Sequence, residues 1–272
     1  MPPCKYFLKG EGTMQSNRVL NLAMCMVVVL LSGLVFTSKA WSGLILDAGV
    51  KGIYEDNING SPSDADKKGD FYTVLSASVG GYTKATDTTY LFLRGDAANY
   101  LYSKYDDLNA TIAGISAGVY KELGDVLSAQ IALKGKIKDF KGGPRDSNAY
   151  GGTFELKQQI TRKFWIKEGY EYEKNDADSN LFSYKGHSVG IWSGYMINPQ
   201  TMLNLGYSYL TRKYEDASNF RTKSHTVSVG AAREIIKKVY VNIGYDRQFN
   251  DSNVPDTDYK NNIYTIGVTY SF

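Results

Sequence analysis

Residues 261–272, NNIYTIGVTYSF, form the stretch that decides the fold. Apolar or aromatic side chains occupy every second position, and mostly small or polar side chains lie between them. Successive side chains of a β-strand point to opposite sides of the sheet, so this period of two predicts a strand with one apolar face. A second sheet could cover that face, or it could be turned toward lipid, and the rest of the chain has to decide.

The first 40 residues differ in composition from everything that follows. Residues 20–36 are nearly all apolar, Arg18 precedes them, and Ser38-Lys39-Ala40 places small residues before a possible cleavage site. This pattern predicts a secretory signal peptide over residues 1–40 and a mature chain over residues 41–272. An uncleaved anchor is the alternative, although a spanning helix needs about 20 apolar residues. Translation could also begin at Met14.

Composition excludes several functional classes for the mature chain. Both cysteines, Cys4 and Cys25, lie in the leader, so disulfides and thiolate metal sites are not expected afterwards. The leader also holds the excess of basic over acidic residues, which leaves the mature chain with balanced charge and gives no reason to expect nucleic-acid binding. The acidic loops lack EF-hand spacing, and no Gly-rich phosphate loop is present, so we expect no metal or cofactor.

Apolar and polar side chains alternate along most of the mature chain, which predicts β-strands. No helical segment in it is long and apolar enough to span a bilayer. About twelve strands are expected, near residues 43–56, 71–85, 89–103, 109–122, 127–140, 149–161, 164–174, 184–197, 201–213, 224–235, 239–248 and 261–272. Long polar links follow the odd-numbered strands and short links follow the even-numbered ones. This regular alternation favours a closed, antiparallel, up-and-down transmembrane β-barrel over a sandwich, whose Greek-key crossovers would break the series.

Three features of the sequence point to a known class of proteins. They are the terminal strand ending in Phe272, the alternation of long and short links, and the opening stretch GVKGIYEDNIN (residues 49–59). On these features the mature chain resembles small porin-like outer-membrane β-barrel proteins of Gram-negative bacteria. The resemblance implies a location in the outer membrane, with lipid and lipopolysaccharide around the barrel. It also implies that the barrel insertion machinery reads the alternating residues of the last strand: Tyr264, Ile266, Val268, Tyr270 and Phe272.

Most strands oppose an apolar face to a charged face. The charged face is expected to line the lumen, because Lys or Arg at mid-bilayer costs about 2–4 kcal/mol. The strand at 164–174 does not separate into one apolar and one charged face, because Glu168 shares a face with apolar residues. A bulge or a misplaced boundary could explain this mixed pattern. The expected lumen-lining residues are Asp47, Lys51, Arg94, Asp96, Lys134, Lys136, Lys138, Glu155, Lys157, Lys167, Glu171 and Asp246.

These features predict a passive channel for small hydrophilic solutes, with an anion preference arising from the row Lys134, Lys136 and Lys138. Alternatively, the charges pair across a nearly filled interior, since barrels of about 8 strands are filled and those of about 16 are open. A structural or partner barrel is also consistent with the strand count. In that case, any secretion or electron-transfer partner would be a separate envelope protein.

A barrel enzyme is the third possibility. His187 and His225 are the only histidines, and Ser188 and Ser224 adjoin them directly in the chain. Adjacent strand residues point to opposite faces, so neither Ser–His pair can act together as a nucleophile and base. We therefore expect no catalytic residues.

Overall fold

A computed structural model describes residues 43–215 and 219–272, and the expected signal peptide lies outside these ranges. Within them, no helix is long and apolar enough to cross a membrane. The elements are twelve strands and three single-turn 3-10 helices: β1 (Gly43–Glu55), η1 (Asp64–Asp66), β2 (Asp70–Thr86), β3 (Thr89–Tyr102), η2 (Asp106–Leu108), β4 (Ala110–Glu122), β5 (Leu127–Phe140), β6 (Ser147–Gln159), β7 (Phe164–Ala177), η3 (Asn180–Phe182), β8 (Tyr184–Asn198), β9 (Thr201–Tyr214), β10 (Arg221–Ile236), β11 (Val239–Ser252) and β12 (Tyr259–Ser271).

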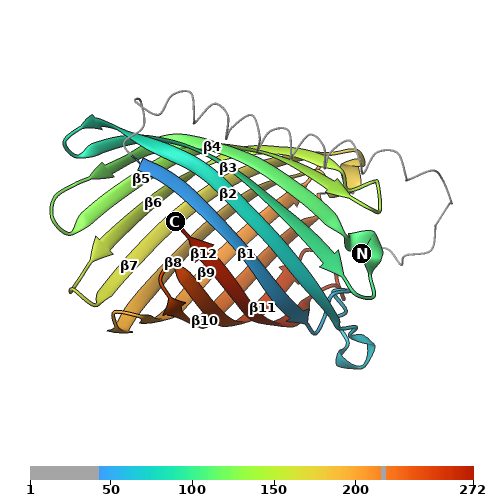
Figure 1. Ribbon diagram of the computed structural model, residues 1–272. Helices are drawn as coiled ribbons and strands as arrows, with labels where there is room; N and C mark the ends of the chain where they lie inside the picture. The colour runs from blue at the N-terminus through green and yellow to red at the C-terminus, as the bar shows by residue number, and fades with distance from the viewer. Residues whose placement is uncertain (1–42, 216–218) are drawn as a thin grey trace.

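The strands form one closed antiparallel barrel in sequence order, as the sequence predicts (Figure 1). Long connections carrying the 3-10 helices gather at one end of the barrel, which we call the loop end. The opposite end, the turn end, has short links such as those at residues 87–88 and 199–200. The predicted alternation of link lengths is therefore confirmed, and it excludes the sandwich.

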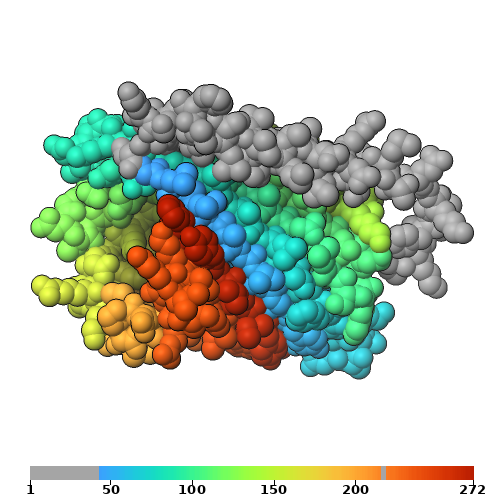
Figure 2. All heavy atoms as spheres, in the orientation of Figure 1, coloured from blue at the N-terminus to red at the C-terminus, as the bar shows by residue number. Residues whose placement is uncertain are grey.

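Closure occurs where β12 pairs with β1, so that the last strand lies beside the first (Figures 1 and 2). The register runs from Asp47 opposite Ser271 to Glu55 opposite Ile263 without a shift. Closure leaves no unpaired strand edge, which is the requirement for sheet structure in lipid.

The register of β7 corrects one sequence-based expectation. This strand pairs with β6 and β8 without a bulge, and shifts occur only near turn-end links such as those of β2 with β3 and β8 with β9. Glu168 is exposed on the outer face, opposite Leu156 and Ile191. The mixed pattern of this strand therefore reflects a carboxylate on the apolar surface and not a change of register.

The outer surface is apolar around the whole barrel. Leu133 is 74% exposed, and Ile266 and Ile243 are 60% and 56% exposed. These side chains project from a wall that buries few large apolar residues, because the interior is polar. The five alternating residues of the terminal stretch, Tyr264 to Phe272, lie on this outer face.

Buried polar side chains hold the loop end together. The side-chain amide of Asn57 donates to the backbone oxygens of Ser61 and Lys260, at 2.8 and 2.9 Å. This residue is 1% exposed, and it ties the first long connection to β12 across the closure. Asp70 accepts hydrogen bonds from the backbone N–H groups of Lys104 and Tyr105, which fixes the next connection in the same way.

We predict that Ile243→Lys destabilises the barrel by about 2–4 kcal/mol in lipid vesicles, because its side chain is exposed on the apolar outer face of β11. Ile243→Leu keeps an apolar side chain and is expected to change stability little. Urea-induced unfolding of both variants in vesicles measures the difference. Equal stability of the two would mean that this face does not contact lipid.

Candidate functional site

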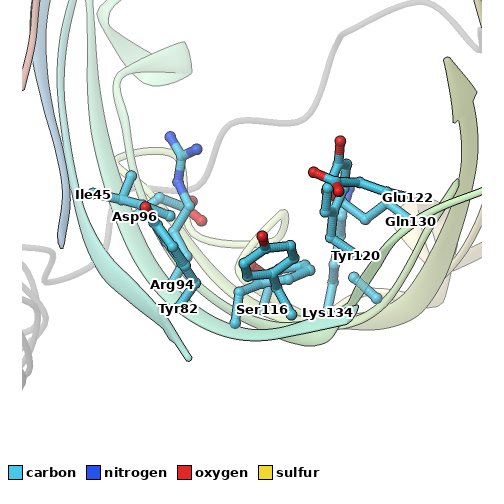
Figure 3. A pocket seen from close by; sticks show the side chains of 12 residues that line it. Ile45, Tyr82, Arg94, Asp96, Ser116, Tyr120, Glu122, Gln130 and Lys134 are labelled. Carbon is cyan, nitrogen blue, oxygen red and sulfur yellow. The ribbon is translucent and has the colours of Figure 1, made fainter. Parts of the chain in front are cut away.

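Because side chains alternate along each strand, those that do not point outward project into the interior of the barrel. A cavity of about 800 Å³ lies against β1 to β5. Figure 3 shows its lining side chains projecting from the curved wall into a common space. Aromatic and charged groups are mixed there, and the labelled residues are Ile45, Tyr82, Arg94, Asp96, Ser116, Tyr120, Glu122, Gln130 and Lys134.

A second interior cavity of about 490 Å³ lies toward the loop end. Its lining includes Lys136, Lys138, Glu173 and Arg212. Asp96 lines both cavities, so they adjoin along the interior. Together they form a polar space that extends through much of the length of the barrel.

The most highly charged part of the wall joins β5 to β7. The ammonium group of Lys134 lies 3.5 Å from the Glu171 carboxylate. Lys136 and Lys138 share the Glu173 carboxylate, at 2.7 and 2.9 Å. These pairs are partly buried, and charged hydrogen bonds of this kind are stronger than neutral ones.

Small residues on β6 allow these side chains to meet. β6 lies between β5 and β7, yet it presents only Ala149 and Gly151 to the interior at this level. A Cβ added to Gly151 would lie 1.9 Å from the backbone oxygen of Tyr172, so no larger residue fits the backbone there. The lysines of β5 therefore extend across β6 to the glutamates of β7.

The remaining expected lumen residues form smaller groups. Arg94 donates to Ser78 at 2.8 Å and lies 3.3 Å from the Asp47 carboxylate, which Ser271 also contacts at 2.6 Å. Lys167 pairs with Glu155 at 3.1 Å.

Two further lysines and one aspartate face the same interior. Lys157 lies over the Trp165 ring, 5.0 Å from its centroid. Lys51 is exposed beside Gly267, and Asp246 lies opposite Ser228 and Ile263. Within residues 43–215 and 219–272, Lys51, Lys157, Asp96 and Asp246 have no oppositely charged group within 4.0 Å.

The sequence reasoning missed Glu173, Tyr184 and Arg212. Tyr184 donates to Glu173 at 2.7 Å, and the Arg212 guanidinium lies 4.8 Å from the centroid of the Tyr184 ring. The period of two that selected Glu171 would have included Glu173. It would also have included Arg212, which shares the polar face of its strand.

The two histidines lie on the outer face. His187 Nδ1 is 2.8 Å from the Tyr170 hydroxyl, and His225 Nδ1 is 2.7 Å from the Tyr207 hydroxyl. The partner in both contacts is therefore a tyrosine and not a serine. In the part of the chain that the structure describes, no group of three His, Cys, Asp or Glu side chains is placed to hold a metal ion.

No protein-family model matches the sequence, and no curated protein matches it in sequence. Solved structures with similar folds do exist. An outer-membrane channel from Pseudomonas putida F1 is 10% identical, with a TM-score of 0.61 over 86% of this chain and 98% of that one. This chain has the fold of an outer-membrane channel. The KdgM porin, solved in complex with disordered oligogalacturonate, is 12% identical, with a TM-score of 0.51 over 83% of this chain and 99% of that one. The NanC porin is also 12% identical, with a TM-score of 0.51 over 83% and 100% of the two chains.

We predict that Glu173→Gln lowers the free energy of unfolding by about 2 kcal/mol, because Lys136 and Lys138 lose their shared carboxylate. Glu168→Gln, on the outer face of the same strand, is the matched control and is expected not to destabilise the barrel. Urea unfolding in vesicles, followed by tryptophan fluorescence, compares the two variants. Equal losses would contradict a specific role for the inner pair.

Proposed function

We propose that this chain is an outer-membrane channel for the passive passage of small hydrophilic solutes. The observation that carries the proposal is the pair of adjoining interior cavities, lined by charged side chains and enclosed by a wall whose outer surface is apolar. A polar interior of this size is suited to hydrated solutes, and selectivity then arises from the charges on the wall.

The apolar outer surface supports a location in the outer membrane of a Gram-negative bacterium. With long loops outside and short turns in the periplasm, the loop end faces the cell exterior. Lipid and lipopolysaccharide would surround the wall. The outward residues of β12, from Tyr264 to Phe272, are the proposed signal for the barrel insertion machinery.

We further propose that the channel prefers anions. In the second cavity, three cations, Lys136, Lys138 and Arg212, accompany three carboxylates, those of Asp96, Glu171 and Glu173. Lys134 beside Glu171 adds a fourth cation, so that this part of the wall has one more cation than carboxylates. The excess of positive charge on this part of the wall would raise the local concentration of anions in a narrow, low-dielectric passage.

A catalytic role has little support in this structure, because both histidines contact tyrosines on the lipid-facing surface. A structural barrel that serves a separate envelope protein would share the same wall. Two adjoining polar cavities along the interior favour the channel over that alternative.

The test is single-channel conductance of the refolded chain, residues 41–272, in planar bilayers of neutral lipid. We expect stepwise currents and a reversal potential in a salt gradient that indicates anion preference. Lys134→Gln/Lys136→Gln should move the reversal potential toward cation preference, because Glu171 and Glu173 then lose compensating charge.

The matched control is Lys121→Gln/Lys163→Gln, which removes two exposed lysines at the turn end and should leave the reversal potential closer to that of the unmodified protein. A closed record from protein shown to be folded would refute the channel and favour the structural barrel.

A further inference from the structure

The last three hairpins repeat a short sequence pattern. Each odd-numbered strand contains Gly-Tyr, and each following even-numbered strand contains Lys, any residue, and then His or Asn. The three units are Gly169-Tyr170 with Lys185-Gly186-His187, Gly206-Tyr207 with Lys223-Ser224-His225, and Gly244-Tyr245 with Lys260-Asn261-Asn262.

The three units also share one geometry. The Tyr245 hydroxyl donates to Asn262 Oδ1 at 2.8 Å, which matches the Tyr170–His187 and Tyr207–His225 contacts. In each hairpin, the His or Asn lies opposite the residue two positions after the tyrosine: Tyr172, Tyr209 and Arg247.

Strand register places the three units at one level around the wall. Tyr170 lies opposite Val189, which lies opposite Tyr209, so Tyr207 is two residues earlier along its strand. The next step repeats this offset, because Tyr207 lies opposite Val227, Val227 lies opposite Arg247, and Tyr245 precedes Arg247 by two. A constant offset of this kind is the stagger of tilted barrel strands, and it keeps equivalent residues level.

The lysine of each unit points outward. It lies two residues closer to the loop end than the His or Asn of the same unit. Lys185, Lys223 and Lys260 are all exposed. The outward tyrosines mark the membrane interface, where aromatic side chains gather on such barrels. Each lysine lies opposite the residue four positions after its tyrosine, about 13 Å further along the tilted strand, so the lysines lie beyond that interface, at the level of lipid headgroups.

Two further cations extend this surface. Lys185 lies directly opposite Lys213, and Lys213 lies directly opposite Arg221. We call Lys185, Lys213, Arg221, Lys223 and Lys260 the basic rim. Like charges directly opposite each other destabilise a sheet, so an external anion would relieve the rim.

Carboxylates within the described chain leave the basic rim largely uncompensated. Asp176 pairs at 2.9 Å with Lys174, which lies opposite Lys185, and Asp251 lies opposite Lys223 in the register. Within residues 43–215 and 219–272, no carboxylate oxygen lies within 4.0 Å of any rim cation.

The rim occupies one side of the barrel only. On β1 to β6, the outward strand positions closest to the loop end carry no basic residue; they are Tyr54, Phe71, Leu101, Thr111, Asp139 and Asn148. The basic rim lies on β8, β9, β10 and β12, within the half of the wall that runs from yellow to red in Figure 1.

We propose that the basic rim binds the phosphate groups of lipopolysaccharide in the outer leaflet. Ammonium groups at headgroup level attract lipid phosphates, and the adjoining tyrosines and His187 or His225 offer hydrogen-bonding groups beside them. The inference rests on the proposed outer-membrane location. It assigns this side of the barrel a layer of bound lipid that the opposite side lacks.

The test measures the affinity of the refolded chain, held in neutral detergent micelles, for bisphosphorylated lipid A. Lys185→Gln/Lys223→Gln/Lys260→Gln is expected to weaken binding by about tenfold to a hundredfold. The matched control, Lys121→Gln/Lys163→Gln/Lys237→Gln, removes three exposed lysines at the turn end and should weaken binding far less.

Equal losses in the two triple variants, or no loss in the first, would overturn the proposal. Binding of dephosphorylated lipid A with unchanged affinity would also overturn it, because recognition would then be apolar. Heat-dependent gel mobility checks that each variant is folded. Conductance in neutral bilayers is measured on the same preparations, so a failure of lipid binding is distinguished from a failure of the channel.

Discussion

The rest of this structure depends on one requirement, the pairing of every strand on both of its sides. Backbone N–H and C=O groups in lipid cannot bond to water, and leaving them unpaired costs several kcal/mol each. The pairing of β12 with β1 meets this requirement by joining residues more than 200 positions apart in the chain. Buried amide groups such as that of Asn57 then hold the loop end across the same junction.

Closure also separates two environments with opposite demands. The outer face tolerates apolar side chains at high exposure, whereas the inner face must hold charged groups in a confined space. Small residues at β6 show how the interior meets this demand, because they let lysines of β5 contact glutamates two strands away. The lysines of β5 are thus compensated by partners that are distant in sequence, and charged side chains line both cavities.

The stagger of the strands determines which outward-facing residues lie at the same height on the barrel. The Tyr–His or Tyr–Asn hairpin pattern recurs at intervals of about 37 residues. Its copies lie at the same height on the barrel wall, because the strand register shifts by two residues for every two strands. Tyrosine contacts to His187, His225 and Asn262 therefore lie at one height. The glutamate at 168 remains the one carboxylate on the lipid-facing side of β7 below this level.

The sequence by itself determined the strand number, the antiparallel order and the two faces of most strands, because a period of two and alternating link lengths are local properties of the chain. It did not place Glu168, and it did not include Glu173 or Arg212 among the inner charges. Tertiary structure alone decided which charges pair, because contacts such as Lys136 with Glu173 depend on an intervening strand of small residues. It also decided which outward residues share a level, since that depends on the stagger set by closure of the whole barrel.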